Sequence, residues 1–390
     1  MQVMAIFLLI GLNTSCTKTE TPPPIVIFPT ISLSQSVLVN EGTGNAANAG
    51  ITVNLSKAST AEFSFKVTTS DGTAIAGQDY TAENGLVVTV QPGELFKTIN
   101  ITLVGDDIFE MDDSFTVSIS DPVGATLGSV TSTKVTIIND DTYTPEIAAD
   151  GPITPDNYPG MTLVWSDEFS DATINADNWT HEQGAGGWGN NELQNYTNMP
   201  GNSSVVDGKL NITATKPAPN FYRSARMISK GKKEFTYGRI DIRAKMPIGK
   251  GIWPALWMLG GNISSVSWPK CGEIDIMEYL GHDQVKIYGT AHYDKNGHQS
   301  KGGNYVLPNG GSYHEQFHVF SIVWQENSIR WYVDYHKYFE VSSTSIEFAA
   351  FNLPQFFIMN IAVGGNWPGN PDASTQFPQT MYVDYVRVFQ

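Results

Sequence analysis

The sequence predicts an all-β protein made of two successive β-sandwiches. Short apolar–polar alternations, bounded by Gly, Asn, Asp or Pro, recur along residues 30–141 and 161–390. A period of two residues is the pattern of half-buried strands, and no long amphipathic helical pattern competes with it. A length of 390 residues, at about 150 residues per domain, fits two or three domains.

Composition excludes several classes of protein. The formal net charge of −16 argues against nucleic-acid binding, which needs a cationic surface. No apolar run reaches the ~20 residues of a membrane-spanning helix, and two cysteines cannot form a disulfide framework. Aromatic residues make up 11% of the chain and include 9 Trp, which suits a surface that binds sugars.

The N-terminus has the features of an export signal. Residues 1–12 form a short apolar run, and small residues lead to Cys16, which resembles a bacterial lipoprotein signal over residues 1–16. Cys16 would then be lipidated and anchor the protein to the outer membrane or cell surface. The alternative is a plain secretory signal with an incidental cysteine. The Pro- and Thr-rich residues 17–29 are predicted to be an extended linker.

Residues 30–141 contain about seven short strand patterns, which indicates a β-sandwich. Carboxylates gather at its turns, and the loops at the ends of strands can converge at one end of a sandwich. A group of carboxylates brought together in this way suits Ca²⁺. The alternative is that these acidic turns only keep the surface solvated. The motifs VNEGTG, DGTAIAGQDYTA, VQPGE and INDD resemble those of a Calx-β domain. The resemblance implies an accessory domain with Ca²⁺ ligands among Glu41, Asp79, Asp106, Asp107, Glu110, Asp140 and Asp141.

Residues 142–160 are rich in Pro, Gly and Asp and are predicted to be an interdomain linker. The remaining segment, 161–390, again shows only short strand patterns. A region of this size without helices suggests a large sandwich of two curved sheets.

The sharpest feature of this second region is CGEIDIMEYLG, with Glu273, Asp275 and Glu278. Glu273 and Asp275 share one face of a strand, whereas the odd offset to Glu278 would place it on the other face. A β-bulge near Ile276–Met277 would return Glu278 to the same side. Like charges on one face repel each other, so the pattern favours catalysis over a structural role.

Two Glu and one Asp suit retaining glycoside hydrolysis, in which one carboxylate attacks and the other transfers a proton. The motif, with YGRIDIRAKMPIGKGIWPALWMLG, GTAHY and NIAVGGNWPGNPD, resembles the laminarinase branch of glycoside hydrolase family 16. The resemblance implies a concanavalin-like β-jelly roll with a concave cleft. It also implies Glu273 as nucleophile, Glu278 as acid/base and Asp275 as the assisting carboxylate.

Other residues are candidates for the walls of a sugar cleft. Indole faces stack on pyranose rings, although Trp residues also pack in cores. Polar side chains of a Gly-rich loop suit sugar hydroxyls, but Glu192 could instead fix its loop, and His292 could be a core histidine. The predicted substrate-binding residues are Asn190, Asn191, Glu192, Trp253, Trp257, Trp268 and His292.

The same resemblance implies a structural Ca²⁺ on the convex side of the catalytic domain. Its ligands would be Glu168, the backbone of Gly208, and Asp384, although Asp384 could equally be a surface residue. No cofactor is expected for catalysis.

The sequence therefore predicts an exported endo-β-1,3-glucanase whose partner is a β-glucan such as laminarin. Mixed-linkage β-1,3-1,4-glucanase and galactanase of the agarase or carrageenase type are alternatives within the same fold. A non-catalytic glucan-binding protein is the alternative from another class, and such proteins lose the Glu pair. The sequence leaves the chain-length preference and the oligomeric state open.

Overall fold

The computed structural model describes residues 28–390 except 43, 45–46, 108–109, 111 and 142–145. The predicted signal segment and Cys16 lie outside these residues. Contacts divide the chain into an N-terminal unit, up to Asp106 with Asp112–Ile138, and a C-terminal unit, Asp107–Met111 with Asn139–Gln390. Over the described ranges, none of the helices has the length and apolar character needed to cross a membrane.

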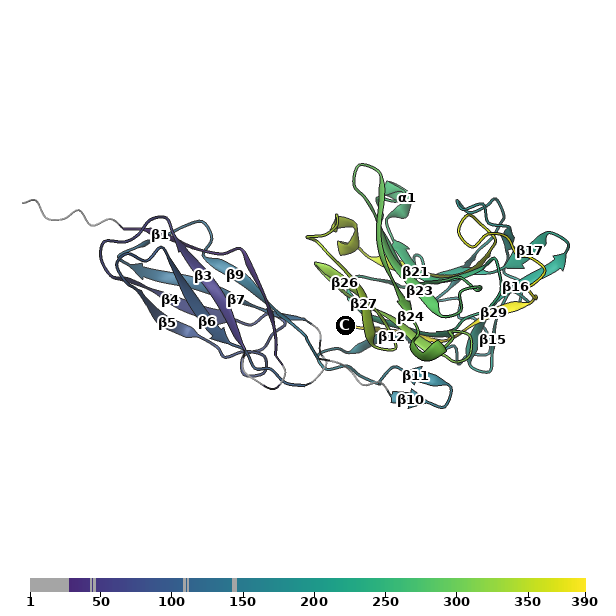
Figure 1. The fold of residues 1–390 in the computed structure, drawn as a ribbon, viewed down its shortest axis with the longest axis horizontal. Coiled ribbons are helices and arrows are strands. Elements are labelled where there is room, and N and C mark those ends of the chain that lie inside the picture. The colour runs from purple at the N-terminus through teal and green to yellow at the C-terminus, as the bar shows by residue number, and fades with distance from the viewer. Residues whose placement is uncertain (1–27, 43, 45–46, 108–109, 111, 142–145) are drawn as a thin grey trace, which may run out of the picture. The chain divides into compact units, whose positions relative to one another are not determined.

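The N-terminal unit is a sandwich of two sheets, as predicted (Figure 1). Alternate residues of β3 are buried, and the core includes Tyr80, whose ring stacks on Phe115 at 4.0 Å between centroids. One sheet has the order β6 (Phe96–Thr102), β3 (Asn48–Leu55), β1 (Thr30–Leu33) and β8 (Thr126–Leu127). The other has the order β2 (Ser36–Asn40), β9 (Ser132–Ile138), β7 (Asp113–Val123), β4 (Phe63–Ser70) and β5 (Asn84–Val90).

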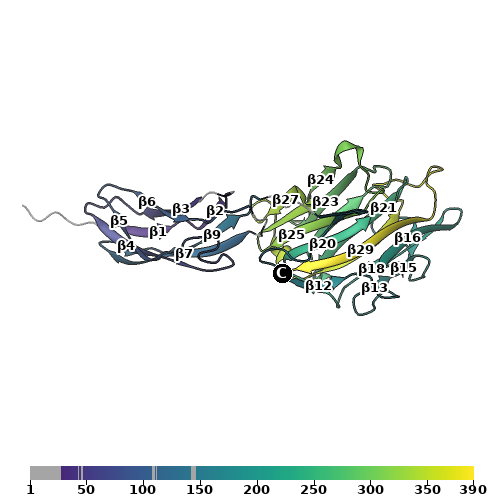
Figure 2. The same ribbon diagram turned by 90° about the horizontal axis from the view of Figure 1, so that it is seen from below.

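The C-terminal unit is a larger sandwich of a ten-stranded and an eight-stranded sheet (Figures 1 and 2). The ten-stranded sheet runs β14 (Gln194–Tyr196), β17 (Phe221–Ser224), β16 (Lys209–Ala218), β29 (Gln379–Phe389), β20 (Gly238–Lys245), β25 (His318–Gln325), β26 (Ser328–Val333) and β27 (His336–Ser342), with β12 (Leu163–Asp167) and β15 (Ser203–Val206) off this path. The eight-stranded sheet runs β13 (Thr180–Glu182), β18 (Arg226–Ile228), β28 (Gln355–Val363), β21 (Ile252–Gly260), β22 (Glu273–Tyr279), β23 (Lys286–Asp294) and β24 (His298–Val306), with β19 (Glu234–Phe235) beside β28.

Apolar side chains from both sheets form one core, which includes Ile242 from one sheet and Ile274 from the other. The indole N–H of buried Trp331 donates across the core to the backbone oxygen of Asp275 at 2.7 Å, which ties the larger sheet to β22. A separate two-stranded ladder joins β10 (Glu146–Ala148) to β11 (Gly151–Ile153). The helices of the described residues are short: α1 (Ile263–Val266), η1 (Pro308–Gly310) and η2 (Ala349–Asn352).

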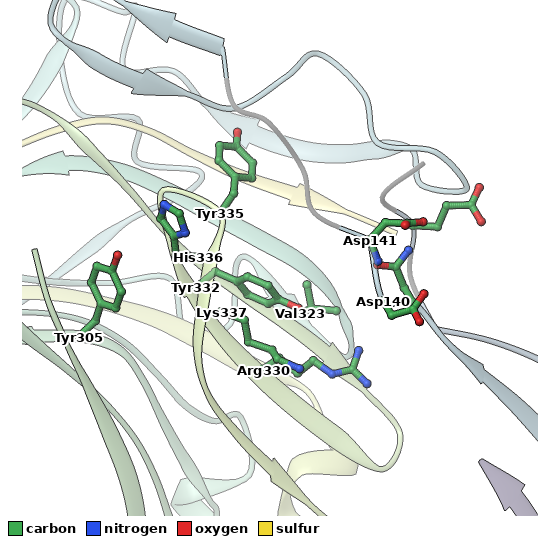
Figure 3. Close-up of a pocket in the computed structure, with 11 residues that line it drawn as sticks. Asp140, Asp141, Tyr305, Val323, Arg330, Tyr332, Tyr335, His336 and Lys337 are labelled. Atoms are coloured by element: carbon green, nitrogen blue, oxygen red, sulfur yellow. The ribbon is translucent and has the colours of Figure 1, made fainter. Parts of the chain in front are cut away.

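The prediction of a linker over 142–160 is wrong for its described part, because this segment packs on the C-terminal unit. Arg243 donates to Asp150 at 2.6 Å and to the carbonyl of Pro152 at 2.7 Å. Tyr335, in the turn between β26 and β27 (Figure 3), donates to the carbonyl of Ile153 at 2.6 Å. Tyr158 is buried as well. The Pro, Gly and Asp residues that suggested a linker instead form a β-hairpin that packs on the C-terminal unit.

Candidate active site

A β-bulge in β22 places the three acidic residues on one face. On β23, Glu273 lies opposite His292 and Glu278 lies opposite Tyr288, with a register shift between Asp275 and Glu278. His292 and Tyr288 are four positions apart, so they share a face of β23. Register with β21 shifts at the same place, which makes Ile276 the extra residue. The structure therefore confirms the predicted bulge.

Each glutamate receives a hydrogen bond from a different tryptophan. The indole N–H of Trp268 donates to Oε2 of Glu273 at 2.9 Å, and that of Trp253 donates to Oε1 of Glu278 at 3.2 Å. Each of the two carboxyl groups therefore has its own hydrogen-bond donor within the site.

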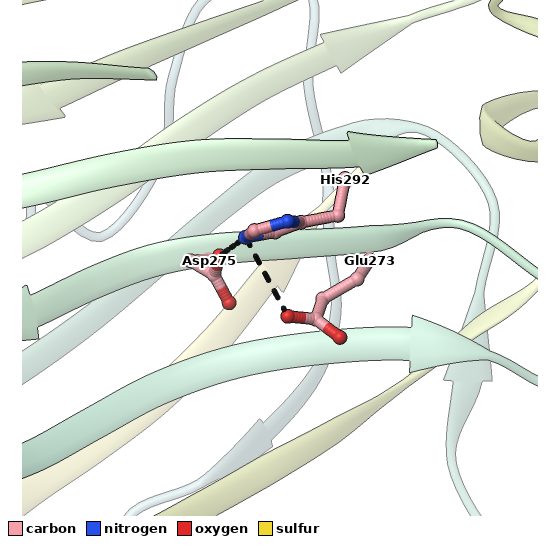
Figure 4. Close-up of side chains that lie close together, drawn as sticks. All are labelled: Glu273, Asp275 and His292. Atoms are coloured by element: carbon pink, nitrogen blue, oxygen red, sulfur yellow. Dashed lines mark ion pairs between the residues drawn. The ribbon is translucent and has the colours of Figure 1, made fainter. Parts of the chain in front are cut away.

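His292 lies against the carboxylates of Glu273 and Asp275 (Figure 4). Its Nε2 is 3.0 Å from Oδ2 of Asp275 and 3.8 Å from Oε1 of Glu273. Its Nδ1 is 2.8 Å from Nε2 of His298, which comes from the next strand, β24. The sequence analysis did not single out His298, because its contact with the site depends on the β23–β24 hairpin.

The environment raises the pKa values of all three acids. Burial and then the charge of Asp275 raise the pKa of Glu273 to about 8, while His292 and the Trp268 hydrogen bond act in the opposite direction. Burial also raises the pKa of Asp275 to about 8. The pKa of Glu278 is raised well above its ordinary value by burial and by the charges of Asp275 and Glu273. Glu278 is thus a suitable proton donor at neutral pH.

Aromatic rings surround these acids. Trp257 lies opposite Asp275 on β21, outside the main core, and its indole N–H donates to Asn360 at 2.8 Å. Trp268 is 45% exposed and available to a ligand. Trp367, which the sequence analysis did not select, is 42% exposed and lies edge-on to Trp253 at 5.5 Å between ring centroids.

The predicted Asn190–Glu192 loop is held mainly through Glu192. This carboxylate accepts hydrogen bonds from Asn190 at 3.3 Å and from Gln194 at 2.6 Å, and burial raises its pKa. The side chain of Asn191 is exposed and donates to Asn366 at 2.8 Å. Glu192 therefore fixes the loop, whereas Asn191 joins it to the loop that carries Trp367.

Two of the predicted calcium ligands of the catalytic domain, Glu168 and Asp384, pair with arginines. Arg387 donates to both carboxylate oxygens of Glu168 at 2.9 Å, and Arg243 donates to Asp384 at 2.7 Å. Gly208 lies in the turn between β15 and β16. Both carboxylates thus have arginine partners within the protein, and the calcium site stays a prediction.

Two pairs of acids in the N-terminal unit lie close together. Oxygens of Glu41 and Asp106 lie within 4.8 Å of each other, and so do oxygens of Asp79 and Asp113, a residue absent from the predicted ligands. Burial and then the charge of Asp79 raise the pKa of Asp113, although its hydrogen bond with Thr73 acts against this. These oxygens fit a divalent cation. The remaining predicted ligands, in segments that group with the C-terminal unit, stay predictions: Asp107, Glu110, Asp140 and Asp141.

Comparison with known proteins identifies the family. Residues 190–387 match the model of glycosyl hydrolases family 16, and residues 28–141 match that of the Calx-beta domain. The chain belongs to glycoside hydrolase family 16. The described residues thus include a family 16 catalytic domain, and such hydrolases need no cofactor for catalysis.

Similar proteins match the catalytic domain. Glucan endo-1,3-beta-glucosidase A1 of Niallia circulans is 41% identical over 59% of this chain, which spans 38% of that protein. Beta-glucanase of Rhodothermus marinus is 38% identical over 60% of this chain, which spans 87% of that protein. The laminarinase catalytic domain of Thermotoga petrophila RKU-1 is 49% identical, with a TM-score of 0.55 over 59% of this chain and 98% of that one. These family 16 neighbours agree with the predicted jelly roll.

Proposed function

We propose that this protein is a retaining endo-β-1,3-glucanase that cleaves laminarin-like β-glucans. The observation that carries the proposal is the bulge at Ile276, which turns Glu273, Asp275 and Glu278 to one face of β22. Retaining glycosidases need two carboxyl groups about 5–5.5 Å apart, one to attack and one to transfer a proton. Two glutamates on one face of a strand supply such a pair.

In the first step, the two glutamates have different roles. Glu273 attacks the anomeric carbon as a carboxylate while Glu278 gives its proton to the glycosidic oxygen, so the C–O bond breaks and a glycosyl ester forms. Burial and the charge of Asp275 raise the pKa of Glu273 to about 8, while the His292 ring and the indole N–H of Trp268 favour the charged form that attacks. Glu278, with its strongly raised pKa, enters this step protonated.

The second step releases the enzyme. Glu278, now a carboxylate, takes a proton from a water molecule whose oxygen attacks the anomeric carbon, and the ester bond to Glu273 breaks. The charge of Asp275 acts on the pKa of Glu273, so Asp275 assists the changes of charge of the nucleophile.

The β-1,3 linkage is proposed because the relatives named above are β-1,3-glucanases, laminarinases or β-glucanases at 38–49% identity. The pair of catalytic acids argues against a protein that only binds glucan. The test is product analysis on laminarin, lichenan and agarose in parallel, with NMR of the first-formed sugar. Release of β-anomers from laminarin supports the proposal, whereas release of α-anomers or preference for agarose would overturn it.

We also propose that the Calx-β domain binds Ca²⁺ through Glu41, Asp106, Asp79 and Asp113. Crowded carboxylates repel one another unless a cation joins them, and Ca²⁺ takes 6–8 oxygen ligands. Calorimetry with CaCl₂ should show binding that Asp79→Asn weakens, while MgCl₂ gives a smaller signal because it demands a stricter octahedron. Equal binding by the variant would contradict this assignment.

We further propose that the protein is exported and anchored through lipidated Cys16. The apolar run over residues 1–12 followed by small residues and a cysteine supports this proposal. Mass spectrometry of the N-terminus should find a lipid on Cys16, and Cys16→Ser should release the enzyme from membranes. An unmodified Cys16 would leave simple secretion as the explanation.

A further inference from the structure

Glu273, Asp275 and His292 also have the arrangement of a metal-ligand group. Nε2 of His292 is 3.0 Å from Oδ2 of Asp275 and 3.8 Å from Oε1 of Glu273, and the three ligand atoms lie within 4.8 Å of one another. Figure 4 shows the ring nitrogen directed toward both carboxylates.

Oδ2 of Asp275 gives a second, independent indication. The Asp275 residue is only 3% exposed, and among the described residues this oxygen has no hydrogen-bond partner, although Nε2 of His292 is 3.0 Å away. A buried carboxylate oxygen without a donor is costly. A cation held between Asp275 and His292 would satisfy both atoms at once.

The donor set fits zinc better than calcium or magnesium. Zn²⁺ binds imidazole and carboxylate at about 2.0–2.2 Å in a tetrahedron, which sets neighbouring ligand atoms about 3.3 Å apart. The observed 3.0 Å and 3.8 Å lie on either side of this spacing. Calcium and magnesium prefer oxygen ligands alone. Three protein ligands also leave a fourth position open.

The surroundings of His292 match those of a metal-bound histidine. Such a histidine ordinarily donates its other ring N–H to a neighbour, which fixes the orientation of the ring. Nδ1 of His292 is 2.8 Å from Nε2 of His298, and the His298 ring lies 4.5 Å from the ring of Trp268. The pair is therefore arranged to turn Nε2 of His292 toward the acids.

We propose that Zn²⁺ binds Glu273, Asp275 and His292 and thereby inhibits the enzyme. The bound ion occupies the nucleophile and its assisting carboxylate, so a sugar cannot be attacked while it is present. The inhibition rests on the proposed function, whereas the binding does not.

Calorimetric titration of the full-length protein with ZnCl₂, in excess CaCl₂ to fill the all-oxygen sites, tests the binding without substrate. We expect one site per chain. Glu273→Gln and His292→Gln should each weaken it by about 10-fold or more, and His298→Ala by about 10-fold. His282→Gln, a change at an exposed histidine outside the group, is the matched control and should bind as the wild type does.

Hydrolysis of laminarin by the wild-type enzyme should fall as the zinc site fills and return when a chelator is added. Absence of zinc binding, equal affinity in His292→Gln, or full activity at saturating zinc would each overturn the proposal. A metal-free enzyme that does not cleave laminarin would count against the proposed function and would leave the calorimetric result as the test of the site.

Discussion

Glu273 and Glu278 stand five positions apart on β22 and yet face the same side of the sheet. Their partners on β23, His292 and Tyr288, are four positions apart, because Ile276 and Met277 together lie opposite the single residue Gly289. A regular strand would have placed the two glutamates on opposite faces. The whole proposed chemistry depends on this one extra residue.

Glu273→Gln should abolish hydrolysis while leaving the fold and glucan binding intact. The amide keeps the volume and can still accept from Trp268, but it cannot attack an anomeric carbon. We expect kcat on laminarin to fall by about 10⁴-fold or more. Glu347→Gln, at an exposed residue paired with Lys295, is the control and should keep wild-type activity. Substantial turnover by Glu273→Gln would place the nucleophile elsewhere.

The free energy of unfolding of the C-terminal unit should decline as the pH rises from 4.5 toward 8. The pKa of Glu273 rises from an ordinary 4.5 to about 8 in the folded protein, so over this range the native state binds more protons than the unfolded state. Stability then falls with pH. Asp275 has a pKa of about 8 for the same reason of burial and adds to the slope.

Glu273→Gln should therefore be more stable than the wild type at high pH only. We expect its Tm to exceed that of the wild type by about 2–4 °C at pH 8 and to match it near pH 4.5. Differential scanning calorimetry at the two pH values measures this difference. An equal increase in Tm at both pH values would show that the effect is not electrostatic.

Much of the fold and of the catalytic face was predictable because those features are local. A short, mostly apolar run indicates β28, which is buried at every position, and the odd offset between Glu273 and Glu278 indicates the bulge in β22 without knowledge of its partner strands. β21 has Pro254 inside a central strand, which is an unusual position for proline. Periodicity alone cannot show that β22 and β28 can pair with a strand that contains a proline.

Features that depend on distant partners could not be predicted. The contacts of Glu168 with Arg387 and of Asp384 with Arg243 join residues 219 and 141 positions apart. Trp367, in the segment after β28, comes near Trp253 on β21 only because β21 and β28 are paired in the sheet. Pairings of this kind are set by the fold and leave no signal in a short stretch of sequence.

Two truncations should distinguish the contribution of residues 146–160 to stability from that of the residues before them. Deleting residues 1–145 should leave an active enzyme with the Tm of the intact C-terminal unit. Deleting 1–160 also removes Tyr158, whose O–H donates to buried Asp241 at 2.6 Å, and Asp150, which pairs with Arg243 at 2.6 Å. We expect a Tm lower by about 5 °C or more, since the lost Tyr158–Asp241 bond is buried and costs about 1–3 kcal/mol, while the exposed Asp150 carboxylate contributes less. Equal Tm values would restore the linker interpretation.

Trp367→Ala should weaken substrate binding without damaging the chemistry. The ring is 42% exposed, touches Trp253 and Tyr288 at centroid distances of 5.5 Å and 4.9 Å, and makes no hydrogen bond to either glutamate. Loss of one stacking surface should raise KM for laminarin by about 3–10-fold with kcat nearly unchanged.

Trp268→Ala should behave differently, because its indole N–H donates to Glu273 at 2.9 Å and its loss should lower kcat as well. Phe221→Ala, at a ring on β17 that is 39% exposed, is the control for removing a surface aromatic residue. Steady-state kinetics on laminarin, with calorimetry of oligosaccharide binding to the Glu273→Gln background, separates the two effects. If Trp367→Ala leaves KM unchanged, the exposed ring does not contact the glucan. If it lowers the Tm as much as a core substitution would, its contact with Trp253 is structural.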